Sequence, residues 1–170
     1  MKKIIVIILL SLFGTINAQM KPTMLSEIDF NEIKIQNQSI YTLQATKGDR
    51  TKLINLFNTT PVESNIDPDG EFLNYKFDGF KIGFSGLIGT KEKPVISRFE
   101  ITKPFWKVTI LGKTVSIGSH YSDLGNNVVI NQEIGGKVIL YKYCDGCNNF
   151  LSIELDSNDK VKRIVFVEPT

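Results

Sequence analysis

Two cysteines form the most specific local motif of the chain, Cys144-Asp-Gly-Cys147. Thioredoxin-like enzymes place such a pair at a helix N-terminus, which stabilises the thiolate, but here it lies in a turn between two apolar segments, 138–143 and 150–155. A structural zinc site needs two further ligands, and the chain has no other cysteine and one histidine. We therefore predict a small disulfide that closes a hairpin, in preference to free thiols, a metal site or redox activity.

The single histidine, His120, limits the hydrolytic chemistry that the chain could perform. A serine hydrolase places an imidazole between a nucleophile and a carboxylate, so any such triad must use His120, which lies in Ser119-His-Tyr-Ser-Asp123. The nearest serine resembling a nucleophile elbow lies in the segment 83–86 and has the wrong spacing. We expect no catalytic residue and a surface histidine in a short helix, with a periplasmic hydrolase using His120 as an alternative.

Residues 65–70, Asn-Ile-Asp-Pro-Asp-Gly, resemble the first half of a calcium-binding loop. In such loops oxygen ligands alternate and glycine permits a sharp turn. The position that should supply a bidentate glutamate is Lys76, and Glu71 comes too early. We predict an acidic turn with no metal or cofactor, and keep a calcium-binding or small-ligand-binding protein as a second alternative.

Aromatic side chains are the candidates for contact with another protein. Phe105 and Trp106 follow Pro104 at the joint between the two halves of the chain, and buried aromatic anchors dominate many interfaces. We predict that Phe105, Trp106, Tyr75 and Tyr141 form the binding set. The alternative for Trp106 is that it covers the seam between two halves of the core.

The elements that must position these residues can be read from periodicity. Asp49 can cap a helix whose Leu53, Ile54, Leu56 and Phe57 share one face. A second, shorter helix has Ser119 as its expected cap and ends at Gly125. Asp78-Gly79 predicts a type I′ hairpin that pairs Phe77 with Phe80, Tyr75 with Ile82 and Leu73 with Phe84. A third strand is expected over residues 95–102.

The chain also contains an internal repeat. Residues 161–169 match 96–104 at the arginine, at the apolar residue after it and at the proline, and 141–146 similarly resemble 75–79. The segment 108–115 resembles 33–40. Similarity in the same order predicts duplication of one structural unit, with residues 19–104 as the first unit and 105–170 as the second.

Two tandem units of strand, helix and three-stranded meander give an α+β fold with a long antiparallel sheet and short helices on one face. This order resembles the architecture of the beta-lactamase-inhibitor-protein-like family. A single unit resembles the small outer membrane assembly lipoproteins of the small protein A type, although this chain has no cysteine near the start of the mature protein to carry a lipid.

The first 18 residues predict export. A basic start at Lys2 and Lys3, an apolar stretch and a small residue at Ala18 are typical of a secretory signal peptide, so we expect a periplasmic or secreted protein that starts at Gln19 and keeps no membrane anchor. Removing Lys2 and Lys3 from the 20 basic residues leaves 18, equal to the 18 acidic residues. A neutral chain argues against nucleic acid as a partner. We expect a non-catalytic protein-binding module, of inhibitor or immunity type. It should use the open face of its sheet and nearby loops to bind another envelope or extracellular protein.

Overall fold

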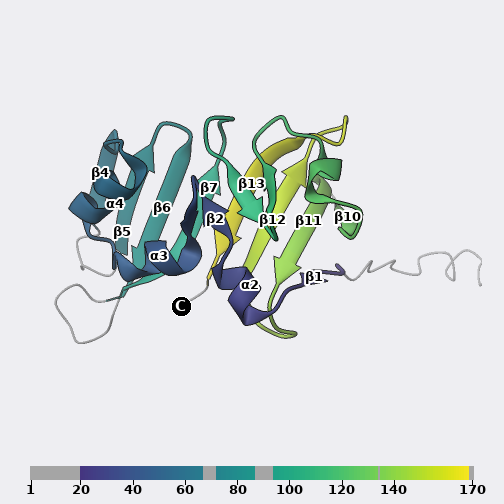
Figure 1. The fold of residues 1–170 in the computed structure, drawn as a ribbon, viewed down its shortest axis with the longest axis horizontal. Coiled ribbons are helices and arrows are strands. Elements are labelled where there is room, and N and C mark those ends of the chain that lie inside the picture. Colours follow the sequence, from purple (N-terminus) through teal and green to yellow (C-terminus); the bar gives the residue numbers. More distant parts are fainter. Residues whose placement is uncertain (1–19, 67–71, 87–93, 134, 169–170) are drawn as a thin grey trace, which may run out of the picture.

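The protein has the expected α+β fold (Figure 1). A computed structural model describes residues 20–66, 72–86, 94–133 and 135–168. The predicted signal peptide and positions 67–70 of the calcium-like segment lie outside the described residues. Within the described ranges, no helix is long and apolar enough to cross a membrane.

One large sheet runs through the molecule in the order β1-β11-β12-β13-β7-β6-β5-β4, with β10 also paired to β11. Every pair in it is antiparallel except β1 with β11. The two halves of the chain meet where β7 pairs with β13 and Phe99 lies opposite Phe166. The strands are β1 (Thr23–Met24), β4 (Glu63–Ile66), β5 (Phe72–Phe77), β6 (Phe80–Ser85), β7 (Val95–Ile101), β10 (Ile130–Glu133), β11 (Gly136–Lys142), β12 (Phe150–Leu155) and β13 (Val161–Val167).

Each half contributes four meander strands to this sheet, one more than the sequence predicts. The additional strands, β4 and β10, are short, and the burial of β4 does not alternate, since all four of its residues are exposed. Alternation of apolar and polar residues is the sequence signal for a half-buried strand. Because β4 lacks this alternation, the sequence does not predict it as a strand.

The hairpin between β5 and β6 has the predicted register, with Phe77 opposite Phe80 and Leu73 opposite Phe84. The turn is not of type I′, however, because only Gly79 has a positive φ, at 76°. Type I′ needs positive φ at both central residues. The peptide of Asp78 is oriented instead by the Trp106 indole, whose Nε1 donates to the Asp78 carbonyl oxygen at 2.7 Å.

A second, small sheet has the order β3-β2-β8-β9. Its strands are β2 (Lys34–Ile35), β3 (Gln38–Ser39), β8 (Val108–Ile110) and β9 (Lys113–Val115). Both of its hairpins have two-residue turns with positive φ at each residue, namely Gln36 and Asn37 in the first and Leu111 and Gly112 in the second. The antiparallel pair β2–β8 therefore joins one hairpin from each half of the chain.

Three α-helices accompany the small sheet on one face of the large sheet: α2 (Glu27–Asn31), α3 (Ile40–Ala45) and α4 (Arg50–Phe57) (Figure 1). As predicted, Asp49 caps α4, since its side chain accepts from the Lys52 backbone N–H at 3.0 Å. The predicted second helix is a 3-10 helix, η1 (Tyr121–Leu124), which ends at Gly125 as expected. Its cap is His120 and not Ser119, whose hydroxyl accepts from the Ser116 backbone N–H instead.

Aromatic side chains fill the core between the large sheet and the elements that cover it. Trp106 packs against Phe80 with ring centroids 4.6 Å apart and against Phe57 at 5.2 Å. At the junction of the two halves, Phe99 stacks on Phe166 at 5.0 Å. These contacts join the interiors of the two halves into one continuous core.

Candidate binding face of the large sheet

Three of the four predicted binding aromatics belong to the core, which corrects the prediction for them. Trp106 is 2% exposed, and Tyr75 and Tyr141 are also buried. The Tyr75 hydroxyl donates to the Gly48 carbonyl oxygen at 2.6 Å, and burial raises the pKa of Tyr75 and raises that of Tyr141 to about 12. In this structure these side chains have no surface to offer a partner, and the alternative for Trp106 at the seam describes its position.

Phe105 is the member of the predicted set that stays on the surface, with 69% of its area exposed. It borders a shallow hollow of about 550 Å³ on the small sheet, together with Lys107, Thr109 and Thr114. Its backbone carbonyl accepts a hydrogen bond from the Gln36 amide at 2.9 Å. Phe105 therefore remains a candidate contact residue, but on a different part of the molecule from the open sheet face described next.

The face of the large sheet opposite the helices is open, and over the first half of the chain it is polar. Successive side chains of β5, β6 and β7 point to opposite faces, so each strand presents polar residues to this face, although in β6 only Lys81 is exposed. The cross-strand register aligns them in two rows: Lys76, Lys81 and Glu100 in one, and Asn74, Gly83 and Arg98 in the next. We call this surface the open face.

A network of ion pairs crosses the open face where the two halves meet. Arg163 of β13 donates through Nε to Glu100 Oε1 at 2.7 Å and through a terminal nitrogen to Glu154 Oε1 at 2.9 Å. Arg98 and Lys81 approach the other Glu100 oxygen at 3.7 and 4.0 Å, and Lys162 approaches Glu154 at 3.6 Å. Residues from both halves are thus held in one fixed arrangement.

The electrostatics of the network follow from its geometry. Burial opposes ionisation of Glu100, but the hydrogen bond from Arg163 and the charges of Arg163, Lys81 and Arg98 outweigh it, so its pKa is lowered. The hydrogen bond that Arg163 donates to Glu100 in turn raises the pKa of Arg163 against the effect of burial. Both groups are therefore charged at neutral pH, and the open face is a fixed pattern of charges.

The open face is hollowed on each half. Over the first half, a depression of about 550 Å³ is bordered by residues of β4 to β7, among them Glu63, Asn74, Lys81, Gly83 and Arg98. Over the second half, a smaller depression of about 360 Å³ has an apolar floor. That floor includes Val138, Leu140 and Phe150.

The sequence contains one signal for the ion pairs on this face. Arg98 and Arg163 occupy matching places in the predicted internal repeat, and the structure places both beside Glu100. Arg163 and Glu100 are 63 positions apart. Their contact depends on the pairing of β7 with β13, which no local pattern specifies.

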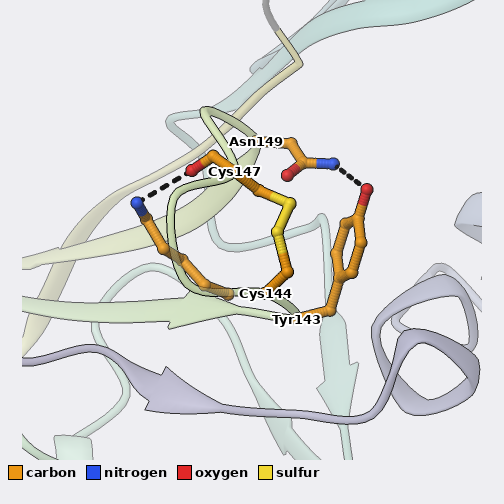
Figure 2. The surroundings of a disulfide bond; sticks show 5 residues. Tyr143, Cys144, Cys147 and Asn149 are labelled. Atoms are coloured by element: carbon orange, nitrogen blue, oxygen red, sulfur yellow. Dashed lines mark hydrogen bonds between the residues drawn. A yellow bond between two sulfur atoms is a disulfide. The ribbon is translucent and has the colours of Figure 1, made fainter.

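Cys144 and Cys147 form the predicted disulfide, with their Cα atoms 5.5 Å apart, in the turn between β11 and β12 (Figure 2). Lys142 Nζ donates to the Cys147 carbonyl oxygen at 2.9 Å. The Asn149 amide donates to the Tyr143 hydroxyl at 2.6 Å. The bridge and these two bonds together fix the turn.

Loss of this disulfide is expected to lower the free energy of unfolding by only about 1–2 kcal/mol, because it closes a short ring and so removes little unfolded-state entropy. Urea unfolding of the oxidised protein with and without dithiothreitol measures the difference. A C144S/C147S variant is the control, since dithiothreitol should not change its stability. A loss above about 4 kcal/mol would show that the bridge supports more than its own turn.

His120 is exposed and has the geometry of a cap. Its Nδ1 lies 2.9 Å from the Ser122 hydroxyl and accepts from the Ser122 backbone N–H at 3.3 Å. Ser85, the serine of the elbow-like segment, is buried in β6. In the part of the chain that the structure describes, no carboxylate hydrogen-bonds to His120, and no three acidic, histidine or cysteine side chains cluster as metal ligands would.

Comparison of the chain with protein-family models, with curated proteins and with solved structures gives no match.

Proposed function

We propose that the protein is a non-catalytic protein-binding module of the periplasm or the cell exterior, of inhibitor or immunity type, which grips another envelope or extracellular protein with its open face. The observation that carries the proposal is the open face itself, where Arg163, Glu100 and Glu154 link the two halves into one charged surface. Strands backed by a continuous core hold this surface rigid. Rigid surfaces lose little conformational entropy on binding, which favours affinity.

The location is part of the proposal. The disulfide between Cys144 and Cys147 is of a kind that persists in oxidising compartments outside the cytoplasm, and the first 18 residues have the pattern of an export signal. Both features favour a periplasmic or secreted protein.

We further propose that the two halves arose by duplication of one unit. In each half a short hairpin precedes a helical segment and a four-stranded meander. The two meanders pair through β7 and β13, and the two short hairpins pair through β2 and β8. A doubled unit explains why the open face extends across both halves.

An affinity experiment tests the proposed function. The mature chain from Gln19 is immobilised and exposed to an extract of the envelope and medium of the producing cell, in parallel with the variant K81E/R98E. The matched control is R50E/K52E, which reverses two exposed charges on α4, on the other side of the molecule. We expect one stoichiometric protein on the wild type and the control, and at least about tenfold less of it on K81E/R98E.

Each other outcome counts against the proposal. A protein that all three chains retain equally would place the binding site away from the open face. Empty eluates from all three would contradict a protein-binding role.

A further inference from the structure

The open face carries more positive than negative charge around the junction of the two halves. Four cations surround two carboxylates there, and all of these groups lie within 4.0 Å of an opposite charge. The cations are Lys81, Arg98, Lys162 and Arg163, and the carboxylates are Glu100 and Glu154. Since the mature chain as predicted is neutral, this local excess is offset elsewhere, for example by Glu27, Asp29 and Glu32 at α2.

The cations also lie closer to solvent than the carboxylate that they share. The side chains of Lys81 and Arg98 are 61% and 56% exposed, whereas that of Glu100 is 15% exposed. A group that approaches from solvent therefore meets the positive charges first. The carboxylate behind them holds the cations in place without neutralising them.

Lys81 and Arg98 have N–H groups that are not used in hydrogen bonds to side chains of the described residues. At 4.0 and 3.7 Å from Glu100, their head groups are beyond hydrogen-bonding distance, and no side chain among the described residues accepts a hydrogen bond from them. The Glu100 oxygen nearest Arg163 is already engaged at 2.7 Å. An incoming acceptor would therefore not have to displace a hydrogen bond within this group.

Gly83 lines the hollow beside these cations. It lies between Asn74 and Arg98 in one cross-strand row, with Lys81 in the next row. Because Gly83 has no side chain, the Asn74 side chain can lie over it: a Cβ placed there would come within 2.8 Å of the Asn74 side-chain oxygen and 3.4 Å of the Ser97 hydroxyl. The hollow of about 550 Å³ described above lies over this row.

We infer that this hollow receives an aspartate or glutamate side chain from a loop of the partner protein, with its carboxylate bonded to Arg98 and Lys81 beside the Asn74 side chain. The inference rests on the proposed function and names the chemistry of the partner. A guanidinium can bind a carboxylate through two parallel hydrogen bonds, which a lysine can supplement. A folded partner suits the site because the hollow is open and continuous with the rest of the sheet face.

The test uses two synthetic 12-residue Gly/Ser peptides as probes, one with three central aspartates and one with asparagines in their place. Each is titrated into the 15N-labelled mature protein, and amide shifts are followed by NMR. We expect the aspartate peptide to shift amides of residues 81–85 and 98–100, and to bind at least about tenfold more weakly to K81Q/R98Q. R50Q/K52Q should bind like the wild type.

A steric variant tests the carboxylate site in a second way that does not depend on charge. Gly83→Ala adds a methyl group 2.8 Å from the position of the Asn74 side-chain oxygen. It should push the Asn74 side chain into the hollow and also weaken binding of the aspartate peptide, once its melting temperature is shown to match the wild type. Should one variant fail to fold, the other still tests the site.

The outcomes separate this inference from the proposed function. Equal binding of both peptides, no shifts from either, or shifts confined to the hollow of the second half would overturn the carboxylate site. If the pull-down nonetheless yields a partner that K81E/R98E loses, the binding function stands and only its chemistry was wrong. If the aspartate peptide binds as expected while no partner is captured, the carboxylate site stands and the proposed function fails. Concentration-dependent dimerisation of the wild type that K81Q/R98Q abolishes would assign the hollow to a second copy of this chain and overturn the inference.

Discussion

Replacing Trp106 with alanine is expected to lower the free energy of unfolding by about 3–5 kcal/mol, as is typical for a large aromatic side chain removed from a core. Trp106 is 2% exposed and contacts Phe80 and Phe57 from two directions. Those neighbours come from different elements, a strand and a helix. They cannot both move into the space that the indole leaves, so a cavity remains.

Trp106→Ala should also destabilise the hairpin between β5 and β6 locally. The indole donates to the Asp78 carbonyl oxygen at 2.7 Å, and that carbonyl belongs to the turn whose geometry departs from type I′. Amide hydrogen exchange at residues 77–80 should therefore be faster in Trp106→Ala than the global loss of stability alone requires.

Phe105→Ala is the matched control, because Phe105 is the adjacent residue in the sequence and is 69% exposed. Its effect on stability should stay within about 0.5 kcal/mol. Chemical unfolding followed by circular dichroism serves all three proteins, since Trp106 is the single tryptophan and its loss removes the fluorescence signal. Similar losses for the two variants would contradict the assignment of Trp106 to the core.

The contrast between Phe105 and Trp106 shows which property could not be predicted from the sequence: the burial of each of these two side chains. The sequence predicted the α+β class, the β5–β6 register and the cap at Asp49, because each depends on neighbouring residues or on a two-residue turn. Two adjacent aromatics at a joint look alike in sequence. Which one faces the core is decided by the path of the chain from β7 into β8.

The solvated face of the sheet could be predicted, but the ion-pair network on it could not, for a related reason. Its charged residues alternate with apolar ones along each strand, so the sequence shows that they are solvated. It does not show that Arg163 meets Glu100, since that depends on which strands are neighbours at the junction of the two halves. Tyr75 and Tyr141 were likewise placed in the binding set although both belong to the apolar side of their strands.

Replacing Arg163 with methionine is expected to lower the free energy of unfolding at pH 7 by about 2–3 kcal/mol, the range for lost hydrogen bonds to a charged group that is left largely buried. The variant keeps much of the length of the side chain but loses the bonds to Glu100 and Glu154. Glu100, 15% exposed, then has cations only at 3.7 and 4.0 Å. Chemical unfolding at pH 7 measures the loss.

Lys162→Met is the matched control on the same strand. Lys162 approaches Glu154 at 3.6 Å, but its side chain is 42% exposed. Exposed ion pairs contribute little, so this replacement should cost at most about 0.5 kcal/mol.

The pH dependence identifies the charge as the cause. In the wild type the pKa of Glu100 is lowered in the folded state, so its contribution to stability is complete above the unfolded-state pKa and is lost as the pH falls through the folded-state pKa. Without Arg163, the two largest effects that lower this pKa are lost, so the folded-state pKa of Glu100 moves upward. The difference in stability between wild type and Arg163→Met should therefore be largest at neutral pH and shrink in acid.

A Glu100→Gln background separates the charge from the packing. In that background, Arg163→Met should lower the free energy of unfolding at pH 7 by less and show weaker pH dependence. Unfolding of all four proteins at several pH values would measure this. A loss that is the same at neutral and acidic pH would show instead that the packing of the arginine stem, and not its charge, stabilises the junction of the two halves.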